Sequence, residues 1–231
     1  MDYSRLHECK KRGTFDFPIE LYYVDKHHSR YQMPFHWHME YELIRVLQGT
    51  FTLILDGQKF VLSAGDSAWI SDGVIHGGTP LDCIYECIVF DLKELLHAVP
   101  HTKLYVDAFL ASAQSFSGPL TQNDCICKLT NSLFCEVNRG DKGYEWATIG
   151  LLCQIIGEIM RVGTGNTATV ANHKQVMRLK RALSLIREKY FEPLRLSDLA
   201  AAAEMTPKYF CRAFAGMTGR TPVDYLIYYR V

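Results

Sequence analysis

The hydrophobic periodicity of this chain changes near Leu92, and this change constrains the fold more than any other feature. Before it, from Phe35 to Asp91, short apolar stretches alternate with turn-forming residues such as Asp56-Gly57, a pair favoured in two-residue hairpins. Several short antiparallel strands in succession are typical of a small sandwich or barrel. After Leu92, the apolar residues recur with the spacing of a helix. The sequence therefore predicts an α+β fold, in which a β-barrel precedes helices.

Short strands are predicted throughout the first region. They cover residues 43–47, 51–55, 60–62, 67–70 and 85–90. Gln48-Gly49 is expected to end the first of them, and residues 63–66 and 71–73 form further turns.

Two amphipathic helices are predicted in the second half of residues 92–162. The apolar face of the first comprises Ile126, Leu129, Leu133, Phe134 and Val137. The apolar face of the second comprises Trp146, Ile149, Cys153, Ile156 and Met160. The break at residues 138–143 contains two glycines, so the two helices form a helical hairpin. This hairpin either packs on the barrel or dimerises the protein.

Composition divides the chain into two domains. Residues 163–173 are rich in Gly, Thr and small polar residues and predict a linker. The first domain then spans residues 1–162, with the barrel at about 18–91, and the second spans 174–231. Residues 173–231 carry 11 Lys and Arg against 5 Asp and Glu, a net charge of +6, although the whole chain is neutral. A basic end on an acidic body is typical of an attached nucleic-acid-binding module.

Several classes of protein are disfavoured. The eight cysteines are scattered, without the paired Cys-x-x-Cys spacing of a zinc finger. The N-terminus has no apolar signal core, and no stretch approaches the length of a membrane span. The expectation is a cytoplasmic protein that does not contact membranes, with reduced thiols and no catalytic residues.

A group of metal-ligand residues lies in the first domain. His36, His38 and Glu42 share the parity of strand residues that point to one side, and His76 comes from another predicted strand. Three imidazoles and a carboxylate suit a divalent metal such as Zn, Ni, Fe or Mn. The alternatives are hydrogen bonds to a small ligand, or satisfied polar residues of the core. The nearby aromatic residues Tyr41 and Trp69 could stack on a sugar ring, or belong to the core.

The second domain contains the layout of a helix-turn-helix. Ser197 is expected to cap the first helix, and Thr206 caps the second, which begins at Pro207. The second helix is expected to bury Phe210 and Phe214, which turns Lys208, Cys211 and Arg212 outward, and to stop at Gly219. Glu204 lies in the turn between the helices, where a positive φ would cost about 1 kcal/mol.

The C-terminal motif resembles the first helix-turn-helix of the AraC/XylS family. The matching residues are Leu199-Ala200, Thr206, Tyr209 to Phe214, Gly219 and Tyr225-Leu226. By the docking mode of that family, the second helix enters the major groove of double-stranded DNA. The DNA-binding residues implied are Thr206, Pro207, Lys208, Tyr209, Cys211 and Arg212. The family continues into a second helix-turn-helix, which is absent from these residues, so weak DNA binding is expected of this chain.

The N-terminal motif resembles the two cupin motifs. His36-x-His38, Glu42 and Gly49 match the first, and Gly65, Gly73 and His76 match the second, although Ser71 stands where Pro is usual. The resemblance implies a double-stranded β-helix that senses a small molecule, with His36, His38, Tyr41, Glu42, Trp69 and His76 as candidate ligand-binding residues.

The leading hypothesis is a homodimeric, ligand-responsive transcription regulator that senses a sugar-like effector. The alternatives are a metal-dependent cupin enzyme, such as a dioxygenase or isomerase, and a dimerising fragment without useful DNA affinity. The helix-turn-helix argues against the enzyme.

Overall fold

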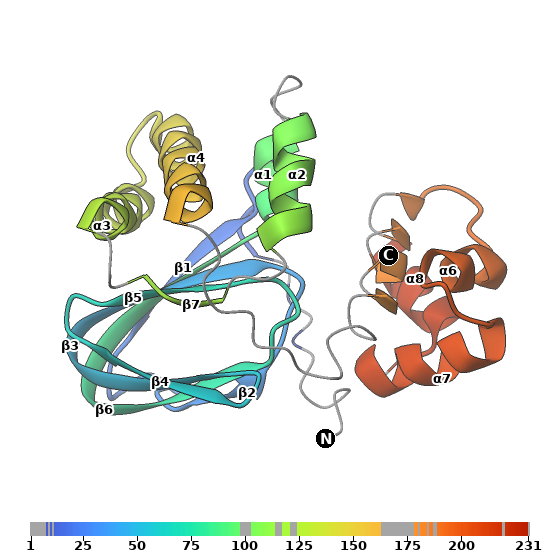
Figure 1. Ribbon diagram of the computed structural model, residues 1–231, viewed down its shortest axis with the longest axis horizontal. Helices are drawn as coiled ribbons and strands as arrows, with labels where there is room; N and C mark the ends of the chain where they lie inside the picture. Colours follow the sequence, from blue (N-terminus) through green and yellow to red (C-terminus); the bar gives the residue numbers. More distant parts are fainter. Residues whose placement is uncertain are drawn as a thin grey trace. The chain divides into compact units, whose positions relative to one another are not determined.

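The fold is described from a computed structural model, shown in Figure 1. The residues described are Glu8, Lys10, 12–97, 103–113, 117–120, 124–162, 178–179, 181–183, 185–186, 189–218 and 220–230. They form two compact units, one within Cys9–Ala168 and one within Met1–Glu8 and Thr169–Val231. The predicted linker at residues 163–173 lies outside the described residues. In the described part of the chain, no helix has both the length and the apolar character needed to cross a bilayer.

The first unit is built on an antiparallel sheet that folds into two layers (Figure 1). Its strands are β1 (Ile19–Val24), β2 (Met33–His36), β3 (Tyr41–Leu55), β4 (Gln58–Ser63), β5 (Ser67–Ile70), β6 (His76–Phe90) and β7 (Gly118–Pro119). The long strands β3 and β6 pair along their whole length and pass through both layers. The first half of β3 pairs with β5, and its second half pairs with β4. The predicted β-barrel in an α+β fold is confirmed.

The strand boundaries differ from those predicted in two places. The strand predicted to end at Gln48-Gly49 continues to Leu55, because Gly49 adopts a φ of +70° and allows a bulge instead of a turn. The final strand begins at His76 instead of residue 85, since its first half pairs with the second half of β3. The Asp56-Gly57 hairpin is confirmed, with φ of 46° and 88° at its two central residues.

Substituting Gly49 with alanine should destabilise the first unit more than the same change at Gly57. Both glycines have positive φ, but a Cβ at Gly49 would lie 2.2 Å from the carbonyl oxygen of Asp82, whereas one at Gly57 would meet nothing within 4 Å. We expect Gly57→Ala to cost about 1 kcal/mol and Gly49→Ala about 2–4 kcal/mol, measured by urea unfolding. Equal losses at the two positions would contradict the close backbone approach at Gly49.

Two apolar clusters hold the first unit together. The cluster between the layers includes Ile44, Val46, Phe51 and Tyr85. The second lies on the outer face of the layer that contains β1 and β5, and includes Leu43 and Trp69. Four helices cover that face (Figure 1): α1 (Leu92–His97), α2 (Lys103–Ala113), α3 (Asp124–Arg139) and α4 (Tyr144–Val162).

The predicted helical hairpin is confirmed as α3 and α4, and its first apolar face packs inward as expected. The apolar stripe predicted on the second helix is only partly buried. Leu152, Ile155 and Ile159 contact the core, while Trp146 and Met160 are 77% and 53% exposed. The apolar residues of α4 are numerous enough to form two faces, and the packing determines which of them is covered.

The second unit is a small helical bundle formed by α6 (Leu196–Ala202), α7 (Pro207–Thr218), α8 (Pro222–Arg230) and helical residues between 178 and 189. Leu183, Leu199, Phe210 and Phe214 are fully or almost fully buried. The inward positions of Phe210 and Phe214 are thus as predicted. Gly219, the predicted stop, lies outside the described residues.

The prediction that Ser197 caps the first helix of the motif is wrong. Arg195 occupies the N-cap position, and its backbone N–H donates to the carboxylate of Asp198 at 2.8 Å. Asp198 is acidic and lies in the first turn, so it also interacts favourably with the positive end of the helix. A carboxylate at this position removes the need for a serine cap.

Glu204 has the positive φ considered from the sequence, at 52°. Arg178 donates to its backbone carbonyl, and Arg181 contacts its carboxylate. These two arginines offset part of the strain of the turn between α6 and α7.

Candidate functional site

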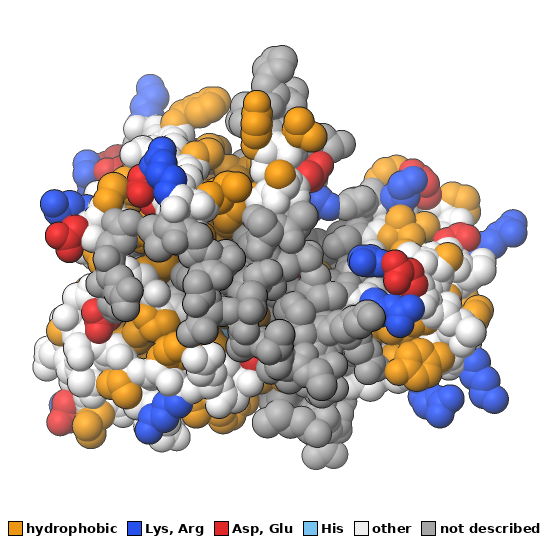
Figure 2. All heavy atoms as spheres, viewed as in Figure 1, with side chains coloured by type: hydrophobic (Ala, Val, Ile, Leu, Met, Phe, Trp, Pro, Cys, Tyr) orange, Lys and Arg blue, Asp and Glu red, His pale blue; other side chains and the backbone are white. Residues whose placement is uncertain are grey.

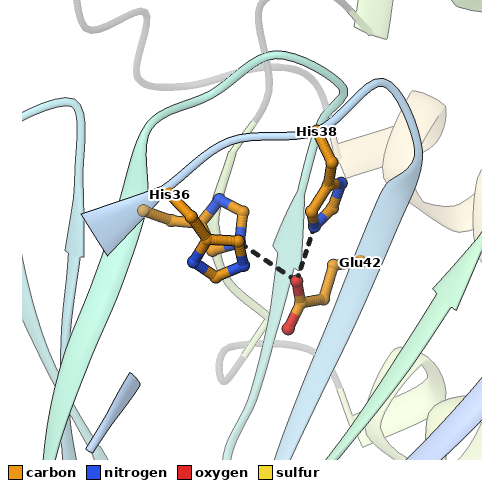
Figure 3. Close-up of side chains that lie close together, drawn as sticks. His36, His38 and Glu42 are labelled. Atoms are coloured by element: carbon orange, nitrogen blue, oxygen red, sulfur yellow. Dashed lines mark hydrogen bonds and ion pairs between the residues drawn. The ribbon is translucent and has the colours of Figure 1, made fainter. Parts of the chain in front are cut away.

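Four ligand-type side chains converge at one end of the first unit. His36 ends β2, His38 follows in the connecting loop, Glu42 is the second residue of β3, and His76 begins β6. His36 and His76 are directly opposite each other in the sheet. One ligand atom from each of the four residues lies within 4.8 Å of the others. Figure 3 shows His36, His38 and Glu42 pointing toward one another, as the strand parity predicted.

The three imidazoles are oriented by the backbone. Each Nδ1 faces a carbonyl oxygen two residues away: His36 contacts Pro34 (2.8 Å), His38 contacts Glu40 (3.0 Å) and His76 contacts Val74 (2.9 Å). A carbonyl oxygen only accepts hydrogen bonds, so each Nδ1 carries the proton. The neutral rings therefore present the lone pair of Nε2 to the centre of the cluster, which is the form that binds metals.

The centre of the cluster suits a cation. One oxygen of Glu42 lies 3.1 Å from Nε2 of His38 and 3.1 Å from Nε2 of His76. When these rings are neutral, lone pairs face a carboxylate in a buried site and repel it. A divalent cation, or protonation of the imidazoles, relieves this repulsion. Three nitrogen ligands and one oxygen ligand, each held by the fold, are compatible with a first-row metal ion.

Burial controls the charges of the cluster. Burial, followed by the charge of His76, lowers the pKa of His36 to about 4, so this ring is neutral near pH 7. Burial also acts to raise the pKa of Glu42. When His38 and His76 are protonated, hydrogen bonds from their Nε2–H groups outweigh this effect and hold that pKa well below its usual value. The thiol of Cys87 faces the same interior, where burial and the charge of Glu42 raise its pKa. The cluster thus contains an ionised carboxylate beside a protonated thiol.

The structure does not bring the two aromatic candidates to this cluster. Tyr41 and Trp69 lie in the core beneath the helices, with ring centroids 5.4 Å apart, and Trp69 also contacts Phe90 and Phe109. Strand alternation explains this placement, because Tyr41 neighbours the inward-facing Glu42, and Trp69 pairs with the outward-facing Leu43. The candidate metal site therefore consists of His36, His38, Glu42 and His76.

The sequence interpretation did not single out two charged residues near the cluster. Glu40 supplies the carbonyl that orients His38, and the buried Arg12 lies 3.4 Å from the carboxylate of Glu40. Glu40 could have been identified from the sequence, because it lies between the ligand positions His38 and Glu42. No sequence pattern indicates that Arg12 contacts Glu40.

The residues predicted to contact DNA lie at the start of α7 and immediately before it. Thr206, Pro207, Lys208, Tyr209 and Arg212 are exposed, and Cys211 is half-buried. Among the described residues, neither Lys208 nor Arg212 forms an ion pair with a carboxylate. Lys and Arg side chains project from the surface of this unit in Figure 2. The exposed face of α7 thus combines two cations with a tyrosine and a threonine.

Comparison with known proteins gives a domain match in the first unit and a relative that matches both units. The family described as "Cupin domain" matches residues 26–79, which include all four cluster residues. The chain is 22% identical over 243 residues to "Uncharacterized HTH-type transcriptional regulator YdeC" of Bacillus subtilis (strain 168). That match covers 99% of this chain and 81% of the relative, so it extends through both units.

Similar solved structures include the AraC-like transcriptional activator CuxR, with a TM-score of 0.48 and 10% identity over 84% of this chain. This chain spans 66% of the CuxR chain, less than two thirds. ToxT from Vibrio cholerae has a TM-score of 0.36 and 10% identity, over 92% of this chain and 98% of its own. Oxalate decarboxylase from Bacillus subtilis has a TM-score of 0.24 and 21% identity, over 26% of this chain and 18% of its own. TM-scores this low add nothing to the assignment.

The fold, the cupin match and the full-length relative define a transcription regulator in which a cupin domain precedes a helix-turn-helix. The residues of α6, α7 and α8 carry the motif that resembles the first helix-turn-helix of the AraC/XylS family, and the chain is similar over both units to an HTH-type transcriptional regulator. The enzyme alternative is not favoured, since the relative that matches 99% of the chain is a regulator.

Proposed function

We propose that this protein is a homodimeric, ligand-responsive DNA-binding regulator whose cupin domain holds a divalent metal on His36, His38, Glu42 and His76. The observation that carries the proposal is the orientation of the three imidazoles. Each Nδ1 is held by a backbone carbonyl, and the other nitrogens of His38 and His76 lie 3.1 Å from Glu42, with a ligand atom of His36 within 4.8 Å. When bound, the metal supplies a Lewis-acidic centre that attracts an oxygen atom of an effector. Sugar-like molecules, which are rich in hydroxyl groups, are the effector class proposed.

The test of the sensing function combines metal content with thermal stability. Protein purified without chelators should contain close to one equivalent of Zn, Ni, Fe or Mn by mass spectrometry. In the metal-loaded protein, an effector from a sugar panel should raise the unfolding temperature, because it binds only the folded state. Absence of bound metal after purification and after reconstitution would contradict the metal site. Turnover of a substrate by the loaded protein would instead favour an enzyme.

The proposed DNA contacts come from α7. Arg212 has the geometry to donate two hydrogen bonds to a guanine, and Lys208 to donate to a guanine or a phosphate. Tyr209, Thr206 and Pro207 lie on the same exposed side at the start of the helix.

Arg212→Ala should weaken binding to DNA selected from a random duplex pool by about 10- to 100-fold and relax the base preference at one position. The control is Lys189→Ala, which removes an exposed cation that lies away from α7 and near Glu192. Fluorescence anisotropy at fixed salt measures both variants. The proposed role of Arg212 fails if both substitutions weaken binding equally and uniformly across sequences, since that result indicates general electrostatics.

The proposed dimer interface is the exposed stripe of α4. It contains two large side chains, Trp146 and Met160, at its ends, with Cys153 midway between them. Gly150 and Gly157 face open space and provide room for a partner helix. Hydrophobic side chains are exposed over this helix in Figure 2. A two-fold axis beside Cys153 would place Trp146 against Met160 of the partner subunit in an antiparallel helix pair.

Trp146→Glu should therefore raise the dimer dissociation constant by about 30-fold or more, as expected when a large aromatic anchor of an interface is lost. Val61→Glu is the matched control, because Val61 is also an exposed apolar residue of the same unit, on β4. Analytical ultracentrifugation across a concentration series gives both constants. A monomeric wild-type chain, or equal effects at the two positions, would contradict this interface.

A further inference from the structure

A buried arginine lies in the segment that precedes β1. The side chain of Arg12 is 3% exposed, although Lys10 and Phe15 on either side of it are exposed. Removing a guanidinium group from water is costly unless it gains a charged partner. Arg12 has such a partner in Glu40, with Nη1 lying 3.4 Å from Oε2. Its Nη1 also donates to the backbone carbonyl of Lys10 at 3.3 Å, so the carboxylate of Glu40, in the loop before β3, is a charged partner of this buried group.

Glu40 contacts the cluster in two ways. Its backbone carbonyl accepts the hydrogen bond from Nδ1 of His38 at 3.0 Å. Its carboxylate lies 3.7 Å from the same nitrogen. His38 in turn lies 3.1 Å from Glu42 through its other nitrogen. A continuous series of contacts therefore runs from Arg12 through Glu40 and His38 to the centre of the cluster.

The segment that carries Arg12 has a defined geometry. Gly13 has a φ of +62°, and a Cβ at this position would lie 2.4 Å from the carbonyl oxygen of Phe17. The N–H of Thr14 donates to that carbonyl at 3.1 Å, and the hydroxyl of Thr14 accepts from the N–H of Phe17 at 3.0 Å. Phe17 packs edge-on against Tyr144 at the start of α4, with ring centroids 5.3 Å apart. The tight turn therefore fixes Arg12 against the loop and joins the segment to α4.

We infer that Arg12 is a positioning residue for the metal cluster, which acts through Glu40 on the orientation of His38. The inference rests on the metal site proposed above. Groups that contact the outer nitrogen of a metal-binding imidazole fix its orientation and basicity. Arg12 holds Glu40, and Glu40 holds His38 with Nε2 toward Glu42.

The first test compares metal affinities. Apoprotein is titrated with Zn²⁺ in competition with a chromophoric chelator, for wild type, Arg12→Gln, Glu40→Gln and the double variant. Each single substitution should weaken Zn²⁺ binding by about 10- to 100-fold. The double variant should lose little more than either single variant, because both substitutions break one series of contacts. Arg12→Lys, which keeps the charge, should recover part of the affinity.

The matched control is Lys10→Gln in the same segment. Lys10 contacts Glu20 and Tyr22, away from the cluster, and should leave Zn²⁺ affinity at the wild-type value. Two further readouts separate positioning from a structural defect. The visible spectrum of the Co²⁺-loaded protein should change in Arg12→Gln and not in Lys10→Gln, while thermal unfolding of the apoproteins verifies that each variant folds.

The outcomes are distinct. Wild-type affinity and an unchanged Co²⁺ spectrum in both Arg12→Gln and Glu40→Gln overturn the inference and leave the metal site standing. Absence of Zn²⁺ binding in wild type and in Lys10→Gln overturns both. If Arg12→Gln does not fold, Glu40→Gln and Arg12→Lys decide the result, since Glu40 is 20% exposed and Arg12→Lys retains the charge.

Discussion

Replacing His76 with glutamine should lower the affinity of the cupin domain for Zn²⁺ by about 100-fold or more. His76 supplies one of three nitrogen ligands, and loss of a direct ligand exceeds the 10- to 100-fold cost typical of losing an outer partner. Glutamine is chosen because it keeps a polar side chain in a buried position where alanine would leave a cavity. Its amide nitrogen has no available lone pair, and its amide oxygen is a poorer ligand for Zn²⁺ than an imidazole nitrogen.

The stability of the loaded protein provides a second measurement. With Zn²⁺ at about 1,000 times its dissociation constant, the wild-type domain gains about 4 kcal/mol, which corresponds to roughly 10 °C in the unfolding temperature. His76→Gln should gain far less at the same Zn²⁺ concentration. His27→Gln is the control, because His27 is exposed and lies outside the cluster. An unchanged Zn²⁺ response in His76→Gln would show that the metal binds elsewhere.

Phe214→Ala should unfold the helix-turn-helix unit while the cupin domain stays folded. Phe214 is fully buried and contacts the rings of Phe210 and Tyr225, with centroids 5.3 Å and 5.4 Å away. Truncating a buried phenylalanine costs about 3–5 kcal/mol, which approaches the whole stability of many small domains. DNA binding should be lost for the same reason.

The contrast with Phe191 makes this prediction specific. Phe191 belongs to the same unit but is 72% exposed, so Phe191→Ala should change stability by less than about 0.5 kcal/mol. Limited proteolysis followed by mass spectrometry distinguishes cleavage within residues 178–230 from cleavage in the cupin domain. Metal binding by the Phe214 variant verifies that the cupin domain survives. Loss of both units together would show that they unfold cooperatively.

Some features followed directly from local sequence pattern. The change from period two to helical period located the boundary between sheet and helices, and Asp56-Gly57 located a hairpin. The spacing of His36, His38 and Glu42 predicted that the three lie together, as they do, although His38 lies in the loop between β2 and β3 and not in a strand. Strand alternation places Tyr41 on the opposite side from Glu42, and strict use of this rule would have excluded that residue from the ligand site.

Other features depended on how distant segments pack. Gly49 was expected to end a strand, but pairing with β6 on both sides of the bulge extends β3 past it. The apolar residues of α4 could face inward in more than one way, and the cluster beneath the helices selected Leu152, Ile155 and Ile159. At the start of α6, the carboxylate of Asp198 accepts a hydrogen bond from the backbone N–H of Arg195, whereas Ser197 was expected to cap this helix.

The sequence alone determined that this chain contains a sheet followed by helices, a cupin motif with four ligand-type residues and a helix-turn-helix that resembles that of the AraC/XylS family. These features are carried by residues close together in the chain, whose spacing fixes the side on which each lies. Only the tertiary structure decided that His76 meets Glu42 and that Arg12 meets Glu40. Such contacts depend on strand register and on the path of a whole segment, which are set by the summed packing of the core and not by any local pattern.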